Sequence, residues 1–300
     1  MVRPRDDFEV GMSLNRYLTR RVFNLGIGMA SFASCLPAWA VDDDPIGDIE
    51  RRHGGRLGVF ALDIGSGRML AHRADERFSL CSTFKGPLAA HVLALVDRGD
   101  QKLDSMVPYS AADLLVASPI TRANVDKGEM SVGALCAAIL HVSDNTAANL
   151  LLARTGGPQA LTAFVRTLGD EVTQFDRYEP QVGKPSGTLD TTTPKAIADT
   201  ARALLLGNGL SPTARAQLET WMVGNEVGRM RMRASFPPSW TAADRTGTDK
   251  GQCAEFAVVR RPDGPPIVVA AYYDAAGMET EPQEAVLREV GAALVAWAGP

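Results

Sequence analysis

The segment CAEFAVVRRPDGPPIVVAAYYDA, residues 253–275, determines which class of fold the chain can adopt. Its apolar side chains recur with a period of two on both sides of PDGP, a combination typical of turns, and so predict two neighbouring strands. The same period occurs just before them in WTAADRTGT, residues 240–248. Far upstream, RLGVFALDI (56–64) and RMLAHR (68–73) flank a glycine-rich turn and predict a β-hairpin. Strands are therefore expected near both ends of the chain.

The chain between these strands has helical spacing instead. Apolar side chains recur with a helical period through much of residues 83–157, where Ser131 marks one helix start. Thr193 and Ser211 each precede a proline, which is the favoured residue at the first helical position. Residues 281–299 close the chain with an amphipathic helix.

This order of elements predicts an α+β fold. A mostly antiparallel sheet would be built from both chain ends and flanked by the terminal helices, with an all-helical domain inserted between them. We place the discontinuous sheet domain at residues 41–76 and 236–300, and the helical domain at 77–235. The cleft between the two parts is the expected location of the active site.

Composition narrows the possible partners. The chain has 300 residues, of which 45% are hydrophobic and 22% charged, enough for a substantial core. Its formal net charge is −4 and its body has no cluster of lysine and arginine, so we do not expect nucleic acid as a partner. The four histidines lack the spacing of metal ligands, so no metal or other cofactor is expected.

The first forty residues resemble an export signal. Arg20 and Arg21 precede a modest apolar run, and Ala-Trp-Ala at residues 38–40 suits signal cleavage. The pattern is similar to that of a bacterial twin-arginine signal peptide, residues 1–40, which implies a periplasmic or secreted protein. The apolar run is too short to span a bilayer, so no stable membrane association is expected after cleavage. Cys35 offers a less favoured alternative, a lipoprotein anchor.

Ser82 and Lys85 are the first candidates for chemistry. They lie three residues apart at a helix start and face the same way. The helix N-terminus offers partial positive charge and free N–H groups to a developing oxyanion. A lysine in a dry cleft near another cation can lose its proton and act as a base. The alternative for this pair alone is an ordinary helix start with a solvated lysine.

Two further stretches carry polar side chains in short motifs. Ser143, Asp144 and Asn145 lie between two expected helices, where Asp144 could simply cap the second helix. Arg245-Thr246-Gly247-Thr248 lies on an expected strand, and its glycine permits close approach of a ligand. An edge strand with a solvated arginine is the alternative for that motif.

The order and spacing of these motifs resemble the penicillin-recognising serine enzymes. FDRYEPQVGKPSGTLDTTTP, residues 175–194, resembles the omega loop of one branch of them, the class A β-lactamases. The chain is therefore identified, on motifs spread over almost its whole length, as similar to class A β-lactamases.

The resemblance implies a catalytic role for several residues. Ser82 would attack the lactam carbonyl, and Lys85 would accept its proton directly or together with Glu179. Ser143 would pass a proton to the departing lactam nitrogen. Glu179 would then activate the water that releases the acyl-enzyme. The resemblance also implies a structural role for Arg177 and Asp190, which would bridge the two ends of the omega loop. The N–H groups of Ser82 and Thr248 would hold the oxyanion. The residues implied in substrate binding are Asn145, Arg231, Arg245, Thr246, Gly247 and Thr248.

The chain departs from the usual family pattern at several of these positions. Arg245 replaces a lysine and cannot shuttle a proton. Gly183 replaces an asparagine that supports the deacylating water, in a shortened omega loop. Ala254 replaces an arginine that binds the substrate carboxylate, a role that Arg231 would take over. Ala117 replaces an aromatic residue at the cleft entrance.

Cysteines add a hypothesis about redox state. Cleavage at residue 40 would leave Cys81, Cys136 and Cys253, an odd number. Some family members bridge the cysteine before the nucleophile to one just beyond the basic-Thr-Gly motif. Asp249 occupies that partner position here, so Cys253 is the remaining candidate for a disulfide with Cys81. Cys136 is expected to be a buried thiol.

We expect a monomeric hydrolase of small-molecule β-lactams, chiefly penicillins, with cephalosporins and carbapenems left open as substrates. A D-alanyl-D-alanine peptidase would share Ser82 and Lys85 but lack the water activator represented by Glu179. A periplasmic β-lactam sensor that acylates without turnover is a second alternative. Such a sensor normally carries a membrane signalling segment.

Overall fold

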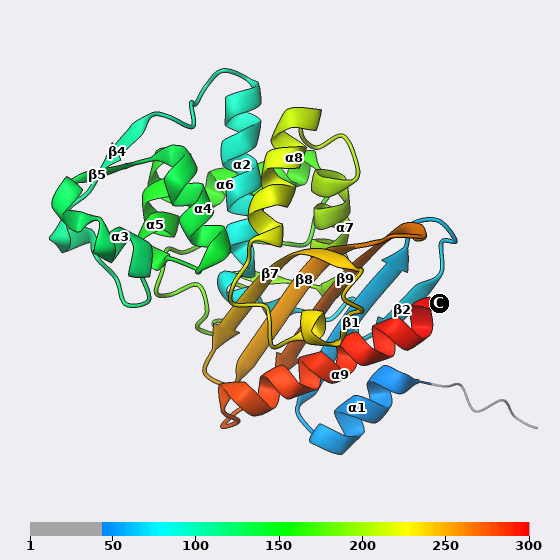
Figure 1. Ribbon diagram of the computed structural model, residues 1–300. Coiled ribbons are helices and arrows are strands. Elements are labelled where there is room, and N and C mark those ends of the chain that lie inside the picture. The colour runs from blue at the N-terminus through cyan, green and yellow to red at the C-terminus, as the bar shows by residue number, and fades with distance from the viewer. Residues whose placement is uncertain (1–43, 300) are drawn as a thin grey trace, which may run out of the picture. The chain divides into compact units, whose positions relative to one another are not determined.

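The computed structural model describes residues 44–299, so the predicted signal peptide and Cys35 lie outside the described residues. Its centre is a five-stranded antiparallel sheet in the order β2-β1-β9-β8-β7 (Figure 1). The strands come from both ends of the described chain, β1 (Arg56–Asp63) and β2 (Met69–His72) from one and β7 (Thr241–Asp249), β8 (Gln252–Arg261) and β9 (Gly264–Asp274) from the other. The hairpin, the three later strands and the α+β fold are thereby confirmed.

Terminal helices cover one face of this sheet. α1 (Pro45–His53) and α9 (Thr280–Ala298) pack beside each other there, together with the short helix η4 (Met232–Ser235) (Figure 1). The strands present alternate side chains to them, such as Cys253, Ala257 and Val259 of β8, because successive residues of a strand point to opposite faces. A continuous apolar cluster fills this layer.

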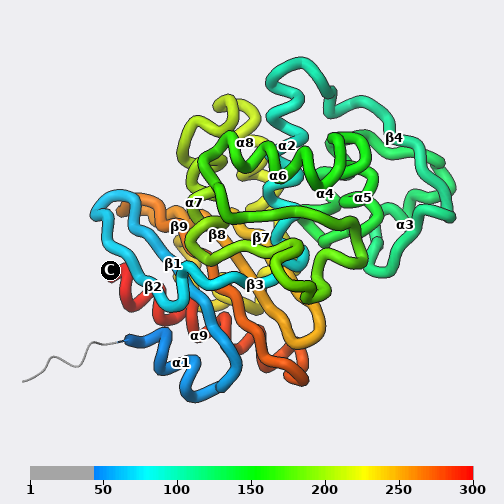
Figure 2. The backbone as a smooth tube through the Cα atoms, turned by 180° about the vertical axis from the view of Figure 1, so that it is seen from behind, coloured from blue at the N-terminus to red at the C-terminus, as the bar shows by residue number. Residues whose placement is uncertain are grey.

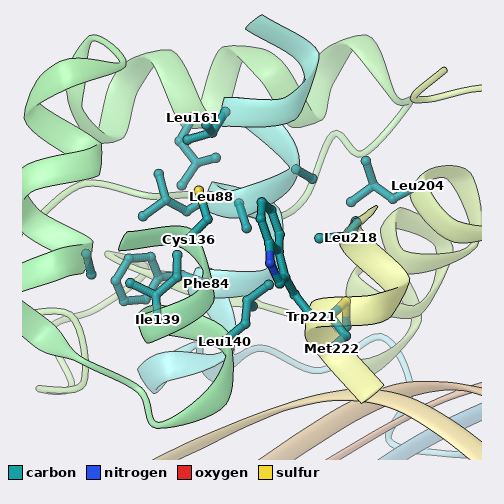
Figure 3. Close-up of a cluster of buried hydrophobic side chains, with 14 of the residues drawn as sticks. Phe84, Leu88, Cys136, Ile139, Leu140, Leu161, Leu204, Leu218, Trp221 and Met222 are labelled. Carbon is teal, nitrogen blue, oxygen red and sulfur yellow. The ribbon is translucent and has the colours of Figure 1, made fainter. Parts of the chain in front are cut away.

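A second apolar cluster fills the opposite face and extends through the helical part of the chain. α2 (Lys85–Asp97) runs through its centre, and its first nine residues are all buried. In Figure 3, Leu88 of α2 and Phe84 just before it lie among side chains from the surrounding helices, including Ile139, Leu161 and Trp221. The surrounding helices are α4 (Val132–His141), α5 (Asn145–Arg154), α6 (Gly157–Thr167), α7 (Pro194–Leu205) and α8 (Pro212–Val223).

The intervening part is mainly helical and also contains two short two-stranded sheets. β3 (Phe78–Ser79) pairs with β6 (Thr191–Thr192) at the end of the omega loop, which the view from behind makes visible (Figure 2). β4 (Met106–Pro108) pairs with β5 (Glu129–Ser131). The remaining short helices are η1 (Cys81–Phe84), η2 (Ala111–Asp113), α3 (Pro119–Ala123) and η3 (Val125–Lys127). The domain boundaries at residues 76/77 and 235/236 stay a prediction.

The expected helix starts are confirmed by their hydrogen bonds. The side chains of Ser131, Thr193 and Ser211 each accept a bond from the backbone N–H three residues later, which satisfies a donor that the helix cannot. Asp144 caps α5 in the same way. Among the helices in the part of the chain that the structure describes, none combines the length and hydropathy needed to cross a membrane.

Candidate active site

The short helix η1 carries Ser82 three residues before the start of the central helix α2. Cys81, the residue before it, has a left-handed backbone with φ of 45°, which costs energy in a residue other than glycine. Lys85 begins α2, and its Nζ donates to Ser82 Oγ over 2.8 Å. The serine and lysine predicted from the sequence are therefore in direct contact.

Lys85 is surrounded by oxygen atoms although its side chain is fully buried. Its Nζ also donates to Ser143 Oγ (3.1 Å), to Asn145 Oδ1 (2.6 Å) and to the Ser143 carbonyl (3.1 Å). Glu179 Oε1 lies 3.2 Å from the same nitrogen. Burial lowers the pKa of Lys85 to about 8, and the charge of Arg245 acts in the same direction while Glu179 opposes it. This shift brings the loss of the proton from the amine closer to neutral pH.

Asp144 holds the loop that carries Ser143 and Asn145. Its buried carboxylate accepts hydrogen bonds from the backbone N–H groups of Ile120, Thr121 and Ala147, and from the Thr121 hydroxyl. Ser143 itself has a φ of 63°, so this loop needs such an anchor. Asp144 is both the helix cap considered from the sequence and the support of the two predicted site residues.

Arg245 enters the site from β7 and is fully buried. Its Nη2 donates to Ser143 Oγ over 2.5 Å, and its Nε donates to the Ser82 carbonyl over 3.2 Å. Burial lowers the pKa of Arg245 to about 9, with a contribution from Arg231, so the guanidinium remains charged at neutral pH. β7 is an edge strand, as the alternative from the sequence had it, but the solvated arginine of that alternative is wrong.

Arg231 is also buried, with 3% of its surface exposed. Its Nη1 donates to the carbonyls of Gly247 (2.9 Å) and Ala254 (2.8 Å), and its Nη2 donates to Thr248 Oγ1 (2.5 Å). Its Nε binds Glu284 of α9 over 3.2 Å. The guanidinium thus joins the end of β7 to the start of β8 at the edge of the site instead of lying in solvent.

Gly247 lets β7 approach the nucleophile. A Cβ at this position would lie 2.9 Å from Cys81 Cβ and from the Leu80 carbonyl oxygen, and 3.1 Å from the Ser82 nitrogen. Only a glycine fits so close to another backbone. A cavity of about 230 Å³ opens beside this contact, lined by Ser82, Ala117, Val142, Ser143, Asn145, Val227, Arg231, Thr246, Gly247 and Thr248.

The omega loop is tied at its two ends by Asp190, which is 1% exposed. Its carboxylate accepts from the side chain of Arg177 and from the backbone N–H groups of Asp176 and Arg177. Arg177 also donates to the Lys184 carbonyl over 2.7 Å, farther along the loop. The predicted contact between Arg177 and Asp190 is therefore present, and it is more than a surface ion pair.

Asn149 positions Glu179 and was missed by the sequence reasoning. Its amide accepts from the Glu179 N–H (2.9 Å) and donates to the Glu179 carbonyl (3.0 Å). The available signal was its spacing, because Asn149 lies one helical turn after Asn145 and so faces the same side of α5. Both asparagines thereby face the site.

The proposed disulfide between Cys81 and Cys253 is not formed. Both cysteines, and Cys136, are buried free thiols. Cys81 Sγ donates to Gln252 Oε1 over 3.2 Å. Because Gln252 and Cys253 are successive residues of β8, they point to opposite faces of the sheet, and Cys253 packs in the cluster of α1 and α9. Cys136 is the buried thiol that the sequence predicts. Within residues 44–299, no group of three or more His, Cys, Asp or Glu side chains could hold a metal ion.

Comparisons with known proteins give the family. The family described as "Beta-lactamase enzyme family" matches residues 43–298. A β-lactamase of Mycobacterium tuberculosis is 44% identical over 271 residues, which cover 87% of each chain. The β-lactamase AST-1 of Nocardia asteroides is 42% identical, over 85% of this chain and 83% of that protein.

Solved structures agree with these relatives. A β-lactamase from Burkholderia vietnamiensis is 56% identical with a TM-score of 0.85, over 86% of this chain and 97% of that chain. An ancestral class A β-lactamase is 47% identical with a TM-score of 0.82, over 84% of this chain and 98% of that chain. With the fold and this set of polar residues, the chain belongs to the β-lactamase enzyme family, in class A, and hydrolyses β-lactam rings.

Proposed function

We propose that this chain hydrolyses penicillins through an acyl-enzyme on Ser82, which water activated by Glu179 then releases. The observation that carries the proposal is the position of Lys85 Nζ. It lies within 3.2 Å of Ser82 Oγ, Ser143 Oγ and Glu179 Oε1, so one amine contacts the nucleophile, the proton donor and the second base. Proton transfer between these groups needs no movement of the chain.

Acylation uses the three groups in sequence. Ser82 Oγ attacks the lactam carbonyl carbon while its proton passes to neutral Lys85, or through a water to Glu179. The C–N bond of the ring then breaks, and Ser143 gives its proton to the nitrogen. Lys85 returns a proton to Ser143 over 3.1 Å. Arg245 orients Ser143 and attracts the substrate carboxylate as a fixed charge, but it takes no proton.

Deacylation depends on Glu179. Its carboxylate removes a proton from a water that attacks the acyl carbon, the ester C–O bond breaks, and Ser82 recovers its proton. The two hydrogen bonds of Asn149 fix the backbone of Glu179, which keeps the carboxylate next to Lys85. A positioned carboxylate of this kind contributes about 10²–10⁴-fold to rate as a general base.

Substrate preference follows from the lining of the cavity. Arg231 is a buried cation in its wall, and the buried Arg245 contacts two lining residues, Ser82 and Ser143, which suits the carboxylate that penicillins carry. The small Ala117 lines the cavity where family members have an aromatic residue, and this leaves room for bulky side chains. A carbenicillin-hydrolysing subgroup of the family also has an arginine at the position of Arg245, and on this resemblance we expect carboxypenicillins among the substrates. We also infer that the protein is exported, loses residues 1–40 and acts as a monomer. N-terminal sequencing of the periplasmic protein would test the cleavage, and its elution volume in gel filtration would test the monomeric state.

The purified protein is mixed with excess benzylpenicillin while ring-opening absorbance and intact mass are followed. The wild type should complete many turnovers with little lasting adduct. Glu179→Gln should accumulate one adduct per chain on Ser82, and Ser82→Ala should form none. One equivalent consumed by the wild type, with a persistent adduct, would instead identify a sensor or peptidase.

A further inference from the structure

The carboxyl group of Glu255, which the proposed mechanism does not use, is buried beside Arg231. Glu255 lies on β8 and is fully buried. Two successive residues at the start of η4 bind two successive residues of β8. Arg231 Nη1 donates to the Ala254 carbonyl, and the Met232 N–H donates to Glu255 Oε2 over 3.0 Å. The other oxygen, Glu255 Oε1, is buried and has no hydrogen-bond partner among the described residues.

The charged groups around Glu255 come from two other elements. Arg231 and Arg233 face it from the segment at η4, and Glu284 faces it from α9. Arg233 is paired with Asp244, and Arg231 Nε binds Glu284. On the neighbouring strands Glu255 lies opposite Thr246 and Ala271, which carry no charge, and Cys253 of its own strand is a neutral thiol.

Glu255 can change its charge under ordinary conditions. Burial raises the pKa of its carboxyl group to about 7, and the opposing effects of Arg231 and the Met232 N–H are smaller. Arg231 therefore faces one carboxylate, Glu284, at low pH and two at high pH. Because Arg231 also lines the cavity, this change occurs next to the place where a substrate carboxylate would bind.

We propose that Glu255 is a positioning residue that sets how strongly Arg231 attracts the carboxylate of the substrate. Protonated Glu255 holds the Met232 backbone and leaves the charge of Arg231 available to substrate, whereas ionised Glu255 offsets that charge. The inference rests on the proposed substrate-binding role of Arg231. It assigns the tighter binding of carboxylate substrates to the lower pH values, at which Glu255 is protonated.

Binding is best measured without chemistry, in a Ser82→Ala background that cannot be acylated. Isothermal titration with benzylpenicillin gives the dissociation constant at pH 6 and pH 8. Because ionised Glu255 offsets only part of the charge of Arg231, we expect binding to weaken about three- to tenfold over this interval. Adding Glu255→Gln, which stays neutral and keeps an acceptor for Met232, should remove this part of the change. Lys85 titrates in both proteins, so the difference between them isolates Glu255.

Two controls separate the possible failures. Glu284→Gln should tighten binding at both pH values, because it removes the carboxylate that contacts Arg231 directly. The methyl ester of benzylpenicillin lacks the carboxylate, so its binding should not respond to Glu255→Gln. The same pH dependence with and without Glu255→Gln would overturn the inference. Unchanged binding after Arg231→Ala would instead refute the proposed role of Arg231.

The test does not depend on the folding of one variant. If Glu255→Gln does not fold, the Ser82→Ala protein alone compares benzylpenicillin with its methyl ester. A greater weakening for the free acid than for the ester between pH 6 and pH 8, which Arg231→Ala abolishes, is the expected result. Equal weakening for both compounds would overturn the role of Glu255.

Discussion

Gly183 and Asp249 make a contact that determines how the omega loop rests on the sheet. Gly183 is buried, and a Cβ built on it would lie 2.5 Å from Asp249 Oδ2 and 3.1 Å from the Cβ and Cγ of the same residue. Asp249 cannot simply turn away at no cost, because its Oδ1 accepts from the Lys250 N–H over 2.7 Å. Gly183→Ala must therefore push the loop away from β7 or displace the Asp249 carboxylate.

The size of the effect follows from this overlap. Forcing one methyl group into a filled position costs about 1–3 kcal/mol, which corresponds to a roughly 5- to 150-fold change in an equilibrium. The contacts of Asp190 hold the loop ends, so the displacement should concentrate near Gly183 and reach Glu179, four residues earlier. We expect Gly183→Ala to slow deacylation about tenfold or more, while acylation of Ser82 changes little.

Quenched-flow mass spectrometry with benzylpenicillin measures both steps. Asp249→Gly removes the opposing atoms, so the double variant should regain most of the deacylation rate, with a coupling energy of about 1–3 kcal/mol. Gly187→Ala is the control in the same loop. No atom lies within 4 Å of its added Cβ, so any cost comes from its φ of 58° and is not relieved by Asp249→Gly. Wild-type deacylation in Gly183→Ala, or no recovery in the double variant, would refute the steric argument.

Further predictions concern the buried polar groups of the site. The acylation rate should rise with pH to an apparent pKa near 8, because Lys85 must lose its proton before it can accept one from Ser82; a flat single-turnover profile between pH 6 and pH 9 would assign the base role to Glu179. Asp144→Ala should lower the free energy of unfolding by about 3–5 kcal/mol, since it leaves several buried donors without an acceptor. A loss below about 1 kcal/mol in urea unfolding would contradict this prediction. The thiols of Cys81, Cys136 and Cys253 should resist a disulfide reagent at pH 8 until the protein unfolds, because burial raises the pKa of each; rapid reaction in the native protein would show that one of them is accessible.

Elements with strong local signals could be predicted from the sequence. The strands of residues 253–275 have a clear period and a turn, and the caps at Thr193 and Ser211 need only nearby backbone. The helical period expected through residues 83–157 stops at Gly156 and Gly157, a pair that indicates a helix end, whereas α6 begins at Gly157 with a φ of 80°. Local patterns do not show that a glycine pair can separate two consecutive helices.

The composition of the site was predictable, but its supports were not. Ser82, Lys85 and Ser143 belong to short motifs, so their types and order were enough to bring them together. The burial of Arg231 depends on carbonyls from two strands and a carboxylate from α9, which are distant in sequence. The misassigned disulfide has the same origin, because which face of the sheet receives Cys253 depends on the packing of the terminal helices.

The close contact at Gly247 divides the site into a part that cannot change and a part that can. No side chain fits between β7 and the residues around Ser82, so a new antibiotic cannot select a larger residue in place of Gly247. The opposite rim is different, since Ala117 and Val227 line the cavity and neighbouring Val116 is 87% exposed. Substitutions at these positions alter the entrance without disturbing buried neighbours. Resistance to bulkier β-lactams should therefore evolve first at the rim, while the wall that holds the nucleophile stays constant.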